Sequence, residues 1–137
     1  MSDIDSLRSQ KWSAEQQYGA CQERIRDCEK KLESLKPAKE RIAAAKDAFR
    51  DIRRQEKREL NESTDWKGST KQDFKNRISD ILDENDLYYS DTLDTALDSI
   101  NDEITRLENK VMEEYGLLGR LGSWINSLAN EIENFFN

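Results

Sequence analysis

Histidine is absent from this 137-residue chain, and proline occurs once and glycine five times. Without histidine there is no imidazole to act as a general base, to activate a serine or cysteine, or to bind a metal. The shortage of proline and glycine disfavours a turn-rich β-sandwich. No apolar run approaches the roughly 18 residues of a membrane-spanning helix, and the N-terminal MSDIDSLRSQKW lacks the apolar core of a cleavable secretory signal. We therefore expect a protein that is made in the cytoplasm.

Apolar residues make up 35% of the chain and charged residues 37%, whereas globular domains average about 45–50% and about 25%. The mean hydropathy is -0.99. This composition disfavours a thick core and leaves either a disordered chain or an elongated helical one with a narrow apolar seam. The net charge of -7 and the pI near 4.8 argue against nucleic-acid binding, which needs a basic face.

The cysteines and acidic residues of this sequence do not have the spacing of a disulfide, a metal site or a catalytic acid–base pair. Cys21 and Cys28 lie seven residues apart, roughly 10 Å along a helix, which is too far for a disulfide. A calcium loop starting at Asp83 would need an oxygen ligand and a glycine where Leu87 and Tyr88 stand. A helical hairpin also offers no cleft to shift carboxylate pKa values for acid–base work. We predict buried reduced thiols, no metal, no cofactor, no catalytic residue and no enzymatic activity.

Apolar residues recur at heptad spacing in both halves of the chain, which is typical of helices that bury one stripe. One row in the first half contains Leu7, Ala14, Cys21, Cys28, Leu35, Ile42 and Phe49. A second row contains Ile4, Tyr18, Ile25 and Leu32, after which we expect the seam to follow Ile42, Ala45, Phe49 and Ile52. The rows of the second half contain Leu93, Ile100, Leu107, Glu114, Leu121, Leu128 and Phe135, and Leu97, Ile104, Val111, Leu118, Ile125 and Ile132. Because only Glu114 is polar among these thirteen, the pattern favours ordered helices over disorder.

The stretch NESTDWKGST at residues 61–70 is the only turn-rich decamer and predicts a break between two helices. Ser69 with Gln72 fits a capping box that starts the second helix. The sequence therefore predicts an all-α, coiled-coil-like antiparallel hairpin forming one domain over 1–137, with helices over about 4–60 and 70–135 and a turn at 61–69. At Pro37, which lacks an amide hydrogen, the first helix either kinks or gives way to a second one near 35–36.

A turn centred near residue 66 sets the expected register of the hairpin. It places Ile25 opposite Leu107, Tyr18 near Glu114, and Trp12 near Leu121. Each helix then buries only one stripe, and a two-helix seam of this kind is thin. We expect a partner, a second copy or an extra fold-back to complete it.

The end of the hairpin formed by the two chain termini carries a surplus of apolar residues, most of them outside the seam rows, and we predict a partner interface there. The predicted interface consists of Trp12, Tyr115, Gly116, Leu117, Gly119, Gly122, Trp124, Phe135 and Phe136. The three glycines either soften the helix or form a groove where a partner helix approaches closely. Arg120 is the only basic residue of this segment, so anionic lipid would not attract it.

Trp66-Lys67-Gly68 stands in the predicted turn, where the tryptophan either caps the seam or serves as a signature. A W-x-G turn between two long amphipathic helices resembles the WXG100 superfamily of type VII secretion. The heptads with Cys21 and Cys28, and the blocks AKERIAAAKDAFRDI, DWKGSTKQDFKN and ALDSINDEITRLENK, resemble the YwqH-like family of Gram-positive bacteria over essentially the whole sequence.

The resemblance implies a non-enzymatic role as an accessory partner of LXG-domain toxins, bound to the toxin's helical domain or to another W-x-G hairpin protein. Trp66 and Gly68 carry over as the turn signature. The family's export signal, a tyrosine followed four residues later by an acid, is not matched, since Gly119 follows Tyr115. The resemblance thus implies export in complex with a partner, or a chaperone-like role in the cytoplasm, with membrane contact only through the secretion machine. The alternative is a self-assembling coiled-coil scaffold, in which a second copy fills the seam.

Overall fold

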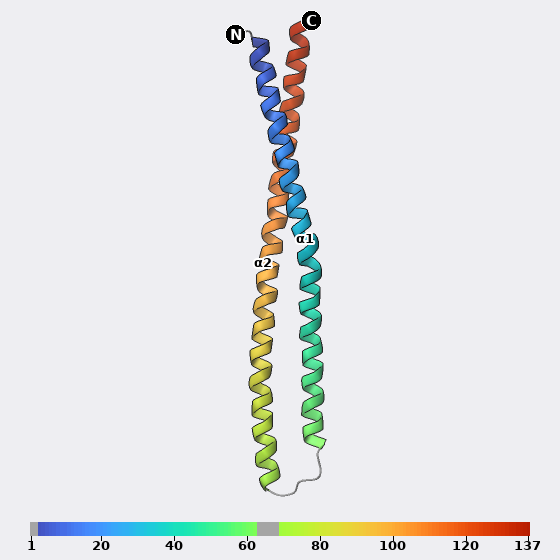
Figure 1. Cartoon of the computed structure of the whole chain (residues 1–137), viewed down its shortest axis with the longest axis vertical. Coiled ribbons are helices and arrows are strands. Elements are labelled where there is room, and N and C mark those ends of the chain that lie inside the picture. Colours follow the sequence, from blue (N-terminus) through green and yellow to red (C-terminus); the bar gives the residue numbers. More distant parts are fainter. Residues whose placement is uncertain (1–2, 63–68) are drawn as a thin grey trace. The chain divides into compact units, whose positions relative to one another are not determined.

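The computed structural model describes residues 3–62 and 69–137, and these form two α-helices. Helix α1 spans Asp3–Glu62 and helix α2 spans Ser69–Phe136 (Figure 1). No strand occurs within the described residues, and the two helices pack against each other. The predicted all-α, antiparallel helix pair is confirmed. Across the same residues, neither helix has a stretch apolar enough to traverse a lipid bilayer.

Helix α1 continues without interruption through Pro37. The alternative of two helices joined near residues 35–36 is therefore wrong. Proline lacks the amide hydrogen of one backbone bond, but a long helix tolerates that loss when packing supports both sides. Asp3 and Asp5 place negative charge in the first turn of α1, where the helix dipole favours it. Trp66 and Gly68, the predicted turn signature, lie outside the described residues.

The contacts within the chain group into two compact units, each built from one segment of α1 and one of α2. Unit 1 consists of Met1–Ser34 and Glu103–Asn137, and unit 2 of Leu35–Asp102. Pro37 stands two residues from the boundary between them in α1. The sequence-based expectation of a single domain over 1–137 stays a prediction.

Unit 1 contains the apolar core. The buried apolar residues of the described chain are Ala14, Cys21, Ile25, Cys28, Leu32, Ile104, Leu107, Leu121 and Leu128. All nine belong to unit 1. Tyr18, Leu117 and Leu118 pack against the cluster that Cys21, Ile25 and Leu121 form. Because each fully buried leucine or isoleucine contributes about 1.5–3 kcal/mol, apolar burial stabilises unit 1 in particular.

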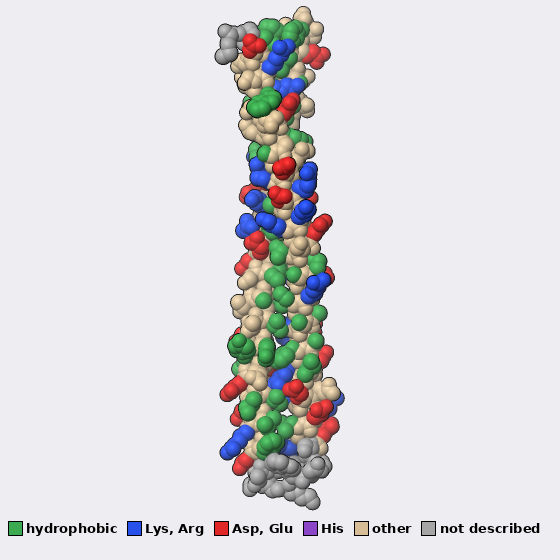
Figure 2. All heavy atoms as spheres, viewed as in Figure 1, with side chains coloured by type: hydrophobic (Ala, Val, Ile, Leu, Met, Phe, Trp, Pro, Cys, Tyr) green, Lys and Arg blue, Asp and Glu red, His purple; other side chains and the backbone are tan. Residues whose placement is uncertain are grey.

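Unit 2 is held by apolar residues that are only half-buried, such as Ile42, Leu93 and Leu97, together with ion pairs and partly exposed rings. Lys46 of α1 pairs with Asp94 of α2, and Lys57 pairs with Asp83. The predicted seam through Ile42, Ala45, Phe49 and Ile52 is only partly correct. Ala45 and Ile52 are exposed, whereas Lys46 is half-buried and Arg53 buried. Apolar side chains gather along one face of this unit (Figure 2).

The register within unit 1 differs from the expected one by about one heptad. Tyr18 was expected near Glu114, but its Cε2 atom lies 3.6 Å from the position that a Cβ atom on Gly122 would take. Glu114 instead contacts Cys21. A shift of seven residues keeps apolar rows facing each other, so the heptad pattern alone does not distinguish the two registers.

Candidate partner-binding surface

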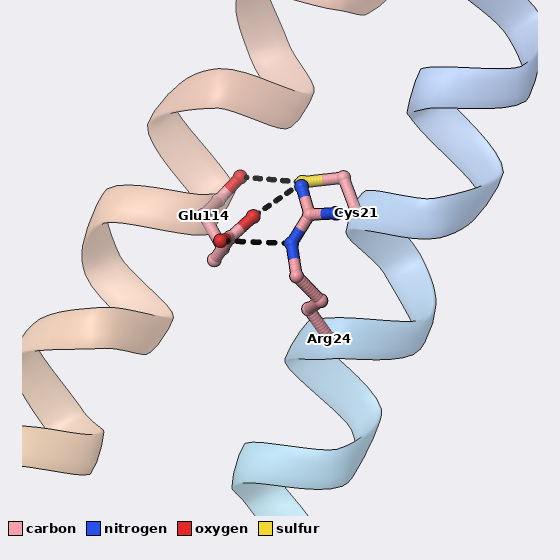
Figure 3. A network of polar contacts seen from close by, with 3 residues as sticks. All are labelled: Cys21, Arg24 and Glu114. Atoms are coloured by element: carbon pink, nitrogen blue, oxygen red, sulfur yellow. Dashed lines mark hydrogen bonds and ion pairs between the residues drawn. The ribbon is translucent and has the colours of Figure 1, made fainter.

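A three-residue polar network interrupts the apolar seam of unit 1 (Figure 3). The thiol of Cys21 donates hydrogen bonds to two oxygens of Glu114, the side-chain Oε2 and the backbone carbonyl oxygen. Each S···O distance is 3.1 Å. Nε of Arg24 donates to Oε1 of Glu114 over 3.0 Å. The Glu114 side chain is only 14% exposed. One seam carboxylate thus receives donors from two residues of α1, and both of its oxygens are satisfied.

This network shifts the pKa of each of its members. Hydrogen bonds from Arg24 and then from Cys21 hold the pKa of the Glu114 carboxyl below its ordinary value. Burial, followed by the hydrogen bond to Glu114, raises the pKa of the Cys21 thiol. The hydrogen bond to Glu114 likewise raises the pKa of Arg24. Unit 1 therefore keeps a charged pair and a neutral thiol in its seam, which suits structure rather than thiolate chemistry.

Five of the predicted interface residues are large, exposed apolar side chains of unit 1. Trp12 and Phe136 are each 65% exposed, and Tyr115, Trp124 and Phe135 between 41% and 53%. The rings of Phe135 and Phe136 lie edge to face with centroids 5.7 Å apart, and the guanidinium of Arg8 lies 5.6 Å from the Phe136 centroid. These side chains are placed where a partner can cover them.

Tyr115 has a partner within the chain. Its hydroxyl donates to Oε1 of Glu29 over 3.0 Å, and this bond to a carboxylate raises the pKa of Tyr115. A shallow groove of about 210 Å³ lies at this contact between the helices, lined by Gln22, Ile25, Arg26, Glu29, Tyr115 and Leu118. Half of the Tyr115 side chain is still exposed.

The remaining predicted interface residues divide into two groups. Gly116 and Gly119 are exposed, and a Cβ atom on either would meet nothing within 4 Å. Gly122 faces Tyr18 of the same chain, and Leu117 packs against the core cluster of unit 1. Gly116 and Gly119 are therefore open to an approaching helix, whereas Gly122 and Leu117 contact this chain's own α1 or core.

Sequence reasoning missed the inward position of Arg53 in unit 2. Arg53 is only 6% exposed, and its Nη1 donates to Oε2 of Glu56 over 2.9 Å. Its guanidinium lies 5.9 Å from the centroid of the Phe49 ring. The alternating spacing of three and four residues that links Ile42, Lys46, Phe49 and Arg53 was the available signal. Apolar residues at 45 and 52 obscured it.

Comparison with known proteins places the chain in a family. A family model described as YwqH-like matches residues 9–130, which takes in most of α1 and α2. Searches of the curated proteins and of the solved structures found no match. The matched region includes the Cys21–Arg24–Glu114 network and the buried residues of both helices. This chain therefore belongs to the YwqH-like family.

Proposed function

We propose that this protein is a non-enzymatic accessory partner of an LXG-type toxin of type VII secretion, which it binds by helix–helix packing. Membership of the YwqH-like family supports a small helical protein of this kind. The observation that carries the proposal is the exposure of large apolar side chains in unit 1, above all Trp12 and Phe136. A partner helix that covers them removes apolar area from water at about 25 cal/mol per Å².

The binding site takes in the exposed residues of the predicted interface. Trp12, Trp124 and the Phe135–Phe136 pair supply aromatic anchors, which are the side chains that most often dominate binding energy. Gly116 and Gly119 supply an open stretch of helix where a second backbone can approach. The shallow groove at Tyr115 is wide enough for a side chain of the partner.

The experiment is a pull-down of the tagged protein from its native host, followed by mass spectrometry and by light scattering of the recovered complex. We expect stoichiometric recovery of a toxin whose N-terminal domain is helical. The purified N-terminal domain should then bind the wild-type chain directly. The combined variant Trp12→Ala and Phe136→Ala should bind it more weakly. Met112→Ala is the matched control, because Met112 is 73% exposed and outside the predicted interface.

The alternative function, a self-assembling scaffold, predicts a different result from the same experiment. Recovery of this chain alone as a stable oligomer of defined mass would reject the toxin-partner role and favour the scaffold. Recovery of the toxin, with unchanged binding by the Trp12 and Phe136 variant, would keep the role but move the interface away from these residues.

A further inference from the structure

The seam of unit 1 contains a glutamate that is bonded to two residues of the opposite helix (Figure 3). The Glu114 carboxylate accepts hydrogen bonds from the Cys21 thiol and from Nε of Arg24, and its side chain is only 14% exposed. A carboxylate at this depth destabilises the seam when its donors are removed, because water replaces them poorly. The network forms only where residue 114 lies opposite residues 21 and 24. Unlike the apolar rows, it therefore distinguishes one register from the next.

The connection between the helices does not account for the observed register. Lys57 of α1 pairs with Asp83 of α2. Helix α1 ends at Glu62, five residues beyond Lys57, whereas α2 begins at Ser69, fourteen residues before Asp83. The first residues of α2 thus extend about 14 Å past the end of α1. A pairing shifted by one heptad towards the turn, which we call the slipped register, would bring these two ends nearly level.

In the slipped register, Glu114 would lose both of its donors. Val111 would face Cys21, and Tyr18 would face Glu114. The phenol of Tyr18 supplies one neutral donor, whereas the observed register supplies a thiol and the guanidinium of Arg24. A hydrogen bond in which both groups are charged is about twice as strong as one between neutral groups. The ion pairs of unit 2 would also change partners, but pairs open to solvent contribute little.

A shift of one heptad in the opposite direction is opposed by the connection itself. It would lengthen the part of α2 that extends past α1 to about 24 Å. That distance is close to the full reach of the chain between Glu62 and Ser69, at about 3.3–3.6 Å per residue. The slipped register is therefore the pairing that competes with the observed one.

We propose that the network of Cys21, Arg24 and Glu114 sets the register of the hairpin, by stabilising the observed pairing of α1 and α2 over the slipped register. The apolar rows supply the stability of either pairing, and the short connection favours the slipped one. The buried carboxylate with its two donors decides between them. A polar residue in a helical seam can select one register in this way at some cost in stability.

The register also decides whether the partner-binding surface of the proposed function is assembled. Trp12 of that surface belongs to α1, and Phe136 belongs to α2. The Arg8 guanidinium, one turn before Trp12, lies 5.6 Å from the Phe136 ring centroid. Slipping by one heptad moves α1 about 10 Å along α2 and breaks this contact. This consequence rests on the proposed function, whereas the choice of register does not.

The test measures the register directly, by pulsed electron paramagnetic resonance of two spin labels. Asp27→Cys on α1 and Ser127→Cys on α2 are both exposed, whereas the native thiols are buried. The slipped register increases the separation of these labels along the helices by about 10 Å. Labelled chains are diluted with unlabelled chains of the same variant, so that only distances within one chain are recorded.

We expect a single distance in the wild type and a second, longer distance in Glu114→Leu, carried by at least about a tenth of the molecules. The melting temperature of Glu114→Leu should stay the same or rise, because leucine suits a seam position. Arg24→Leu, which removes the charged donor from the other helix, should also produce the longer distance. Glu113→Leu is the matched control, at an exposed neighbouring position, and should keep the single distance.

A single, unchanged distance in folded Glu114→Leu would overturn the inference, since the register would then be set elsewhere. If Glu114→Leu fails to fold, the same result in Arg24→Leu overturns it. The purified helical domain of the toxin gives a second measurement. Its affinity should fall with the slipped fraction, about tenfold where nine molecules in ten have slipped. If this domain does not bind the wild type, the proposed function fails, while the label distances still test the register.

Discussion

The thiol of Cys21 donates a 3.1 Å hydrogen bond to Glu114, a residue 93 positions further along the chain. This contact joins the first and last segments of the sequence at the centre of unit 1. Arg24 completes it by pairing with the second oxygen of the same carboxylate. The seam therefore tolerates a glutamate because two residues of the opposite helix supply donors.

Acid should weaken unit 1 through Glu114. Its pKa is lower in the folded chain than the ordinary 4.5, so the unfolded chain binds more protons in acid. The stabilisation is present above pH 4.5 and is lost as the pH falls through the lower, folded pKa. Melting temperatures measured by circular dichroism from pH 7 to pH 3 should fall a few degrees more for wild type than for Glu114→Gln. Glu113→Gln, at an exposed position, is the control, and its melting temperature should fall with pH as that of wild type does. The same pH dependence of the melting temperature in all three proteins would contradict the prediction.

Both thiols should be protected from alkylation in the folded protein. Cys21 is 0% and Cys28 4% exposed, and burial raises the pKa of Cys21, so little thiolate is available. We expect alkylation at pH 8 to be at least about 100-fold slower than in urea, because it requires opening of unit 1. A cysteine introduced by Ser127→Cys, at an exposed position of α2, should react at the rate of an unfolded thiol. Fast modification of Cys21 in the native protein would show that the seam opens readily.

Amide hydrogen exchange should distinguish the two units. All nine buried apolar residues lie in unit 1, so amides around Ile25 and Leu107 should exchange slowest. Amides around Phe49 and Tyr88 should exchange at least about tenfold faster, since unit 2 buries a charged residue rather than an apolar core. Mass spectrometry of peptides after timed exchange measures this difference. Equal protection in both units would contradict it.

Alanine in place of the open glycines should stabilise α2. Gly116→Ala and Gly119→Ala should each raise the free energy of unfolding by about 0.5–1 kcal/mol, because alanine loses less backbone entropy and its Cβ meets nothing within 4 Å. Gly122→Ala should raise the free energy of unfolding at least as much, because the added Cβ would make an ordinary contact with Tyr18 at 3.6 Å. Urea titration measures all three.

A larger side chain tests whether a partner helix uses the same glycines. Gly119→Leu should leave the free protein folded and weaken binding of the toxin's helical domain. Unchanged binding by this variant would place the partner helix on another face of α2.

The sequence predicts the helices of this protein far better than it predicts their mutual register. Helix existence follows from local periodicity, and the observed α1 and α2 bounds lie close to the expected 4–60 and 70–135. Register depends on how two periodic rows meet, and rows with a seven-residue repeat meet equally well one heptad away. Tyr18 was therefore placed opposite Glu114, although Gly122 lies there.

The same reasoning explains which site residues were found and which were missed. Exposed aromatic residues such as Trp12 and Phe136 are recognisable because they fall outside an otherwise regular seam. The predicted seam through Ile42, Ala45, Phe49 and Ile52 left Arg53 out, because charge ordinarily stays in water. Its burial depends on Phe49 and the rings packed near it, a tertiary arrangement that residue type alone does not indicate.

The contact between Arg8 and Phe136 determines where a reporter can be attached. The Arg8 guanidinium lies 5.6 Å from the centroid of the Phe136 ring, so the second turn of α1 and the last turn of α2 are neighbours. Bulky fusion proteins at both ends would compete for the same space and pull these turns apart. A donor and an acceptor dye at the two ends would instead be held at short range, and loss of energy transfer between them would register the opening of unit 1 in real time.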